Sequence, residues 1–128
     1  MDKRRVMVID DETSFLELVK INLEHTGKFD VQTLSDTSDV LSRVRSFNPD
    51  VILLDILMPK MDGVEICKLF NGDPVTSRIP IITLSALDTD KDKLMMYKLG
   101  VVSFLVKPIE SYDLIAGIEK ALRNKGLA

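Results

Sequence analysis

Acidic side chains follow two short apolar runs in this sequence. Residues 6–9 end in Asp10 and Asp11, and residues 51–54 end in Asp55. Two carboxylates about 5 Å apart repel each other by roughly 3 kcal/mol at an effective dielectric near 20, so a cluster of three needs a counter-ion. Oxygen ligands that leave coordination positions open favour Mg²⁺, with Mn²⁺ as a substitute. The sequence therefore indicates a divalent cation site, provided that the two acidic ends meet.

Two further polar residues, Ser85 and Lys107, each follow a later apolar run. A lysine ammonium supplies a point charge for an anion, and a serine hydroxyl can donate to a phosphoryl oxygen. A carboxylate becomes a nucleophile toward phosphorus when a cation and a lysine neutralise the incoming group. The set that would suit phosphoryl transfer to or from a carboxylate comprises Asp10, Asp11, Asp55, Ser85 and Lys107.

The apolar runs that carry these side chains are typical of strands. Residues 51–54 lack polar alternation, which favours a strand buried on both faces of a parallel sheet. Residues 29–34 alternate like an edge strand. Strands are predicted over 6–9, 29–34, 51–54, 80–84 and 101–106, and helices over 13–25, about 40–47, 64–69, 88–99 and 111–120. This alternation predicts an α/β three-layer αβα sandwich, whose right-handed crossovers bring all the strand ends to one edge.

Helical periodicity also predicts which side chains are buried. The first helix places Phe15, Leu16, Leu18, Val19 and Leu23 near one face. The lone cysteine, Cys67, is expected to pack in the core. Met95 and Met96 could form a surface for a partner, but we expect ordinary core packing for them. The residues at positions 36–38 are the candidates for the N-cap of the second helix. His25, at a helix end, is expected on the surface.

Size and composition narrow the function classes. The chain has 128 residues, 45% of them hydrophobic, and a net charge of −3, which suits one domain over residues 1–123 with a tail or the start of a linker at 124–128. The sequence has no basic stripe and few aromatic residues, and both features argue against direct nucleic acid binding by this chain. The first apolar stretch is too short for a signal peptide or membrane span, so we expect a cytoplasmic protein without a membrane partner.

The motifs together resemble the receiver domains of response regulators, the CheY-like family of two-component signal transduction. The resemblance runs from about residue 5 to residue 122, and no single motif would carry it. It rests on Asp10-Asp11, on Asp55 with the sequence MPKMDG behind it, on Ser85-Ala86 and on Lys107-Pro108. The resemblance implies a flavodoxin-like (βα)5 fold with strand order 2-1-3-4-5, which places both acidic ends beside the topological switch point.

The resemblance also assigns roles to residues. Asp55 would accept a phosphoryl group from a sensor histidine kinase, a histidine phosphotransfer protein or a small acyl phosphate. Asp11, Asp55 and the backbone carbonyl of Leu57 would ligate Mg²⁺, with Asp10 acting largely through water. Lys107 would be aimed at the acidic edge by a cis peptide bond to Pro108. The domain would catalyse only its own phosphorylation and dephosphorylation.

Two residues are expected to transmit the signal. Ser85 would move toward the phosphoryl group, and Phe104, at the aromatic switch position, would turn inward, although an aromatic residue in a strand is also simply a core residue. This would remodel the surface formed by residues 88–99, 101–106 and 111–120, through which a target protein or a fused output domain is controlled. Leu57 and Leu87 flank the site, and because both are apolar we expect a long-lived phosphorylated state.

The sequence leaves several readings open. The chain could be a self-contained receiver or a part of a longer regulator or hybrid kinase. Valines at 101–102 disfavour a dimer held by acidic residues there, so a monomer or an apolar, phosphorylation-linked dimer is expected. An enzyme with an aspartyl nucleophile, such as a phosphatase, is the alternative. Such an enzyme would need a second catalytic aspartate two positions after Asp55, and this sequence has Leu57 there.

Overall fold

The main sheet of the protein has five parallel strands. A computed structural model describes residues 2–58, 61–85 and 90–126, apart from the side chains at 57, 58, 61, 62, 85 and 90–92. The sheet has the order β2-β1-β3-β6-β7, which is 2-1-3-4-5 when only its own strands are counted. Its strands are β1 (Arg4–Ile9), β2 (Phe29–Leu34), β3 (Val51–Asp55), β6 (Ile81–Ser85) and β7 (Val101–Val106).

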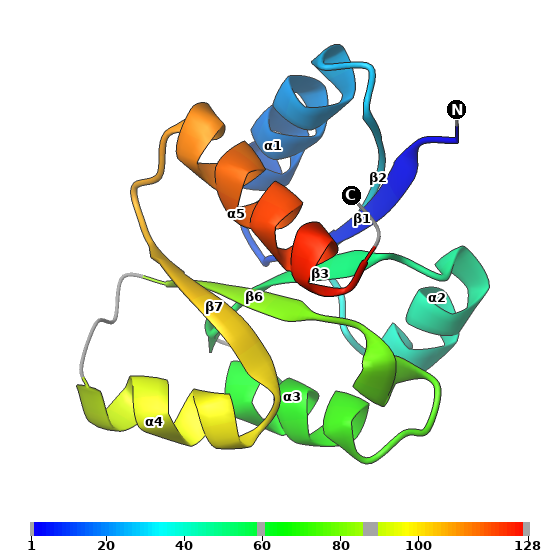
Figure 1. Ribbon diagram of the computed structural model, residues 1–128. Helices are drawn as coiled ribbons and strands as arrows, with labels where there is room; N and C mark the ends of the chain where they lie inside the picture. Colours follow the sequence, from blue (N-terminus) through cyan, green and yellow to red (C-terminus); the bar gives the residue numbers. More distant parts are fainter. Residues whose placement is uncertain (1, 59–60, 86–89, 127–128) are drawn as a thin grey trace.

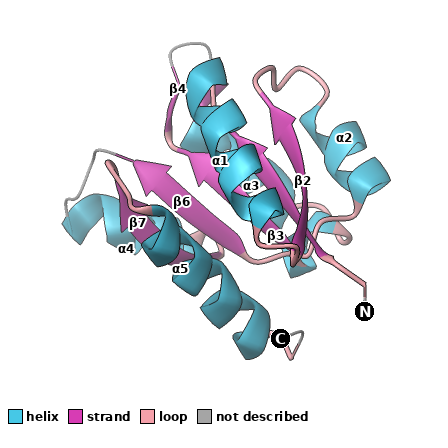
Figure 2. Ribbon diagram, turned by 90° about the horizontal axis from the view of Figure 1, so that it is seen from above, coloured by secondary structure: helices cyan, strands magenta, loops and turns pink. Residues whose placement is uncertain are grey.

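Helices cover both faces of this sheet. Two lie on one face, α1 (Thr13–His25) and α5 (Ser111–Asn124), and three on the other, α2 (Val40–Phe47), α3 (Gly63–Asn71) and α4 (Asp90–Lys98) (Figure 1). Figure 2 looks down on α1 and α5 with the sheet behind them. The three-layer sandwich and the strand order expected from the sequence are confirmed.

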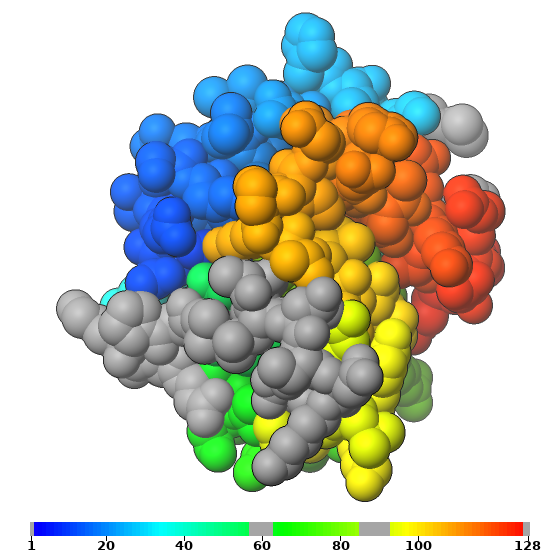
Figure 3. Space-filling model, turned by 90° about the vertical axis from the view of Figure 1, so that its left-hand side faces the viewer, coloured from blue at the N-terminus to red at the C-terminus, as the bar shows by residue number. Residues whose placement is uncertain are grey.

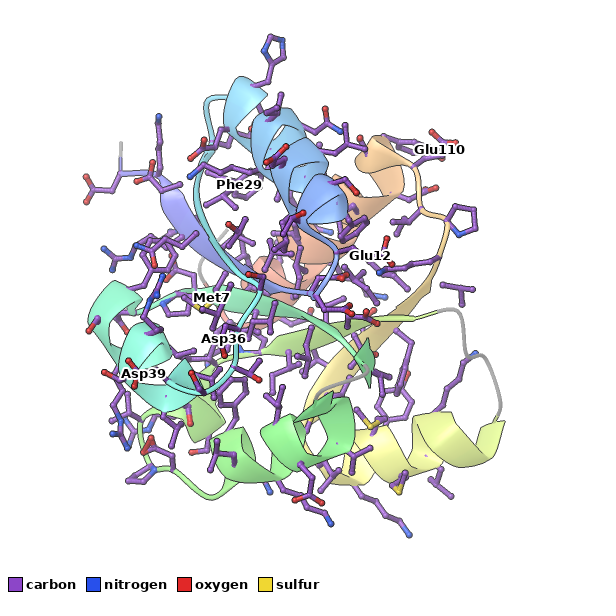
Figure 4. All side chains as sticks on the ribbon, turned by 180° about the vertical axis from the view of Figure 1, so that it is seen from behind. Met7, Glu12, Phe29, Asp36, Asp39 and Glu110 are labelled. Atoms are coloured by element: carbon purple, nitrogen blue, oxygen red, sulfur yellow. The ribbon has the colours of Figure 1, made fainter. Side chains whose placement is uncertain are left out.

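Strand alternation divides the core into two clusters. Val6 and Val8 of β1 point toward α1 and α5, whereas Met7 and Ile9 point toward α2, α3 and α4. Figure 4 shows Phe29 on the α1 side of the sheet and Met7 on the α2 side. Because β1 and β3 lie inside the sheet, every residue of 6–9 and 51–54 is fully buried. This explains why both runs are continuously apolar.

The strand predictions agree with the structure to within a few residues, but the loops contain more order than expected. The Pro/Gly loop after β3 holds a small antiparallel pair, β4 (Leu57–Met58) and β5 (Met61–Asp62), and the 3₁₀ helix η1 (Thr76–Arg78) precedes β6. Such short elements are set by tertiary contacts and leave no periodic signal in the sequence.

The second helix also begins differently from the expectation. Asp39 occupies its N-cap position and makes no side-chain cap hydrogen bond. Asp36 instead accepts from the backbone N–H of Ser38 at 2.9 Å, a local turn that ends before the helix starts. Figure 4 shows Asp36 and Asp39 in the segment that leads into α2. The helix ends at Phe47, and its C-cap residue, Asn48, has a left-handed backbone with a φ of 53°.

Two of the side chains predicted to be buried are exposed. Leu18 on α1 is 58% exposed and Met95 on α4 is 43% exposed. Leu94, which precedes Met95, is also 58% exposed. Met96 and Cys67 are buried as predicted, and His25 is exposed at the end of α1. Periodicity identifies a helix but does not fix how wide its buried stripe is, because that depends on the neighbouring helix. Within the described ranges, no helix has the length and apolar content needed to cross a bilayer.

Candidate functional site

Three carboxylates meet where β1 and β3 end. These strands are direct neighbours, with Ile9 opposite Leu54, so the residues that follow them lie side by side. Asp10, Asp11 and Asp55 each place a carboxylate oxygen within 4.8 Å of the others. Figure 3 looks at this end of the molecule, where the N-terminal segment in blue lies next to the segment after β7 in orange. The acidic cluster expected from the sequence is therefore present.

Asp10 is the anchored member of the cluster. Its side chain is fully buried; one carboxylate oxygen accepts from the Lys107 ammonium at 2.7 Å and the other from the backbone N–H of Glu12 at 2.9 Å. Figure 4 places Glu12 at the start of α1, beside the strand end. Both oxygens of Asp10 therefore already have protein donors. Its role toward a cation, which the family resemblance gives as acting largely through water, stays a prediction.

Lys107 reaches two carboxylates at once. Its ammonium lies 2.7 Å from Asp10 and 3.6 Å from Asp55, and its side chain is 18% exposed. The cis peptide bond to Pro108 predicted from the sequence is present. Burial acts to lower the pKa of Lys107, but the hydrogen bond to Asp10 and the charges of Asp10, Asp55 and Glu12 outweigh burial and raise this pKa. The amine is held as a cation against the acidic cluster.

Gly63 brings the loop after Asp55 back against the strand end. Its N–H donates to the carbonyl of Ile56 at 3.2 Å. A Cβ atom at this position would lie 2.6 Å from the Cα of Ile56 and 3.1 Å from the carbonyl oxygen of Asp55. Because these are backbone atoms that cannot turn aside, only glycine allows the approach. Gly63 thereby helps to hold Asp55 in place.

The donor set at this edge fits a hard divalent cation. Three carboxylates and one ammonium give the site a net charge of about −2. The carboxylates offer oxygen ligands, which a hard divalent cation prefers. Asp11 is exposed to solvent, and Asp55 is 4% exposed at the end of β3. Leu57 lies two residues beyond Asp55, in β4, and its carbonyl remains a predicted ligand.

The predicted switch residues lie on adjacent strands. Ser85 is the last residue of β6 and pairs with Val106; its hydroxyl, the side chain of Leu57 and all of Leu87 lie outside the described residues. Phe104 is half-buried in β7 and packs against the α2, α3 and α4 side of the core. Its ring meets that of Tyr97 edge to face, with centroids 4.8 Å apart and planes at 79°.

Sequence reasoning missed three contributors to the site: the backbone of Glu12, the ring of Phe15 and the ring of Tyr97. Phe15 lies 4.2 Å below the Lys107 ammonium, and Tyr97 is 54% exposed beside Phe104. Helical spacing predicts Phe15 only as a core residue, and it gives no sign that the ring faces Lys107. Sequence spacing reveals neither the contact of Phe15 with Lys107 nor that of Tyr97 with Phe104, because each contact joins two different secondary-structure elements.

Comparison with known proteins gives a consistent result. The family model described as "Response regulator receiver domain" matches residues 6–119. The chain is 34% identical over 125 residues to the alkaline phosphatase synthesis transcriptional regulatory protein PhoP of Bacillus subtilis, covering 98% of this chain and 51% of that protein. It is 34% identical over 120 residues to the DNA-binding dual master transcriptional regulator RpaA of Synechocystis, covering 94% of this chain and 49% of that protein.

The chain thus spans about half the length of these curated relatives. Among solved structures, the chemotaxis protein CheY4 of Vibrio cholerae superposes with a TM-score of 0.88 at 26% identity, over 94% of this chain and 100% of that one. The strand order agrees with the CheY-like fold of this neighbour. The chain therefore belongs to the response regulator receiver domain family of two-component systems.

Proposed function

We propose that Asp55 is the phosphoryl acceptor of this receiver domain. The observation that carries the proposal is the position of the Lys107 ammonium, 2.7 Å from Asp10 and 3.6 Å from Asp55, at the edge where the strands end. An incoming phosphoryl group beside Asp55 would find a fixed positive charge there. Asp55 is the last residue of the buried strand β3, and this fixes the position of its carboxylate.

The reaction transfers a phosphoryl group between two activated carriers. A carboxylate oxygen of Asp55 attacks phosphorus, and the bond from phosphorus to the histidine nitrogen or acyl oxygen of the donor breaks, with the electron pair leaving on that atom. Lys107 pairs with the charge on the phosphoryl oxygens, while Asp10 holds Lys107 in place. Mg²⁺ or Mn²⁺, held by Asp11, Asp55 and the Leu57 carbonyl with Asp10 behind, would supply further neutralisation of that charge.

Phosphorylation replaces a singly charged carboxylate with a group near −2 that has more acceptor oxygens. We propose that the hydroxyl of Ser85 bonds to it and that Phe104 then turns inward. The half-buried ring of Phe104 and its edge-on contact with the exposed Tyr97 support this, because movement of one ring removes a contact of the other. The surface made by α4, β7 and α5 would change, as a shift between existing populations.

The output and its setting are part of the same proposal. A sensor histidine kinase or phosphotransfer protein would supply the phosphoryl group in the cytoplasm, where Mg²⁺ and ATP-derived donors are available. The recipient would be a target protein or an output domain joined beyond residue 123. A DNA-binding output is supported by the name of the RpaA relative, which is described as DNA-binding, and a role in transcription by the name of the PhoP relative. The receiver would act as a monomer or as a dimer formed on phosphorylation.

We propose that the phosphorylated state is long-lived because apolar residues flank the site. Leu57 and Leu87 offer no group to orient a hydrolytic water, so we expect slow hydrolysis for this family. Replacing both with acidic or amide residues should accelerate the loss of phosphate. An unchanged rate in that double variant would rule out their modulating role.

The test of Asp55 is incubation with acetyl phosphate and Mg²⁺, followed by intact-mass measurement. Wild type should gain one phosphoryl group, and Asp55→Asn none. Asp11→Asn and Lys107→Ala should react much more slowly. The matched control is Asp30→Asn, an exposed acidic residue on the edge strand β2, which should react like wild type. A metal-dependent adduct that persists in Asp55→Asn would overturn the assignment, and so would the absence of any adduct on wild type.

A further inference from the structure

The Lys107 ammonium has a third neighbour besides Asp10 and Asp55. Its nitrogen lies 4.2 Å from the centroid of the Phe15 ring. Phe15 belongs to the first turn of α1, and Lys107 follows β7, so the contact joins two elements that are distant in the sequence. The amine is bounded by two carboxylates and one aromatic face.

An aromatic face attracts a cation without competing for its protons. The attraction between an ammonium and a ring face at such a distance is stronger where water is excluded. A lysine side chain has four rotatable carbon–carbon torsions, and its charge is strongly hydrated. Because the ring occupies one side of the ammonium, it restricts these torsions and leaves less room for water. The ring thereby reduces the range of positions that the ammonium can take between Asp10 and Asp55.

The ring itself is held by packing on the α1 and α5 side of the sheet. Phe15 is half-buried and packs against the core cluster to which Val19 and Leu114 belong. It also lines a small pocket between α1 and α5. Asn22 of α1 donates to the hydroxyl of Ser111 at 2.9 Å at the same junction. These contacts fix α1 relative to the segment that carries Lys107, so the ring is a firm support for the amine.

We propose that Phe15 is a positioning residue for the phosphoryl reaction. Its ring face holds the Lys107 ammonium where it meets the phosphoryl group, and it does so without touching the reacting atoms. This inference rests on the proposed role of Asp55 and Lys107. The positioning role depends on the electron density at the face of the Phe15 ring, whereas a purely structural role in the core would depend only on the apolar volume of the side chain.

The experiment changes the ring face without changing its shape. Phenylalanine at position 15 is replaced by analogues carrying one, two and three ring fluorines, which progressively weaken the attraction of the face for a cation. The second-order rate constant for phosphorylation by acetyl phosphate should fall stepwise, by about two- to tenfold over the series. Phe15→Leu should be slow, and Phe15→Tyr, which keeps the face, should recover most of the rate.

A second measurement reports the contact in the metal-free protein. Protons on the carbon next to the Lys107 amine should be shifted upfield by the ring current of Phe15 in the NMR spectrum. Phe15→Leu should remove that shift. The matched control is the same fluorine series at Phe29, a buried ring in the same core cluster, which should leave both the rate and the shift unchanged.

The outcomes separate this inference from the function on which it rests. If wild type is phosphorylated and the rate is flat across the fluorine series at Phe15, the positioning role is wrong while the role of Asp55 stands. If wild type gains no phosphoryl group, the proposed function fails, and the positioning role fails with it. A Lys107 shift that survives in Phe15→Leu shows that the ring does not hold the amine and overturns the inference directly.

Discussion

The ammonium nitrogen of Lys107 lies 2.7 Å from a carboxylate oxygen of Asp10, across 97 residues of sequence. Their strands, β7 and β1, are not neighbours, because β3 and β6 lie between them in the sheet. The lysine side chain therefore reaches over the ends of two strands to a buried carboxylate. This ion pair links the two halves of the sheet at the edge where Asp55 is placed.

The pH dependence of stability should reveal this ion pair. The pKa of Lys107 is raised in the folded protein above its ordinary value of 10.5. The charged amine therefore stabilises the fold fully below pH 10.5, and this contribution is lost as the pH rises through the folded-state pKa. Urea unfolding of the metal-free protein between pH 8 and 11.5 should show a steeper alkaline loss of stability in wild type than in Lys107→Met. Lys98→Met, an exposed lysine on α4, controls for the change in net charge.

Cation binding should stabilise the folded state. At a free Mg²⁺ concentration of ten times the dissociation constant, one site adds about 1.4 kcal/mol to the free energy of unfolding. The thermal midpoint of wild type should rise from EDTA to millimolar Mg²⁺, and Asp11→Asn should lose most of that rise. Asp30→Asn should keep it. An equal rise in Asp11→Asn and wild type would show that the ion binds somewhere else.

Gly63→Ala should disturb both stability and phosphorylation. The added methyl would lie 2.6 Å from the Ile56 Cα and must displace the backbone that carries Asp55. We expect the free energy of unfolding to fall by about 2 kcal/mol or more. Phosphorylation by acetyl phosphate should also slow severalfold.

Gly117→Ala on α5 is the matched control. The new methyl there would meet the flexible Leu105 side chain at 3.3 Å, and alanine favours a helix, so stability should change by less than about 1 kcal/mol. Equal effects of the two substitutions would contradict the argument from backbone contact.

Two buried threonines should respond oppositely to valine. Thr83 is 1% exposed, and its hydroxyl has no hydrogen-bond partner among the residues that the structure describes. Thr83→Val should raise the free energy of unfolding by about 1 kcal/mol. Thr76 is fully buried and donates to the Phe70 carbonyl at 2.8 Å, so Thr76→Val should lower it by about 1–2 kcal/mol. Chemical denaturation measures both, and a destabilised Thr83→Val would show that its hydroxyl has a partner in solution.

The ion pair between Arg45 and Asp73 should matter more than other surface pairs. The Arg45 guanidinium donates to one oxygen of Asp73 from two nitrogens, at 2.7 and 3.1 Å, and the Asp73 side chain is only 6% exposed. Arg45→Met leaves that carboxylate buried without its cation and should cost about 1–3 kcal/mol of stability. Lys68→Met breaks the exposed pair with Glu65 and should cost less than about 1 kcal/mol in the same denaturation assay.

The sequence was enough to predict the layers and the acidic edge, because the relevant signals are local. The runs at 6–9 and 51–54 are apolar throughout, since both strands are buried on two faces, and each passes directly into acidic residues. Once the strands are parallel, their carboxyl ends must share an edge. The positions of Asp10, Asp11, Asp55 and Lys107 follow from that rule alone.

Only the tertiary structure decided which atoms touch. The pairing of Lys107 with Asp10 in preference to Asp55, and the ring of Phe15 beside it, depend on sheet twist and on how α1 and α5 pack. The exposure of Leu18 and Leu94 depends on the spacing of neighbouring helices in the same way. A periodic sequence fixes the direction in which a side chain leaves its own strand or helix. The distance to a side chain on another element is fixed only when the whole core packs.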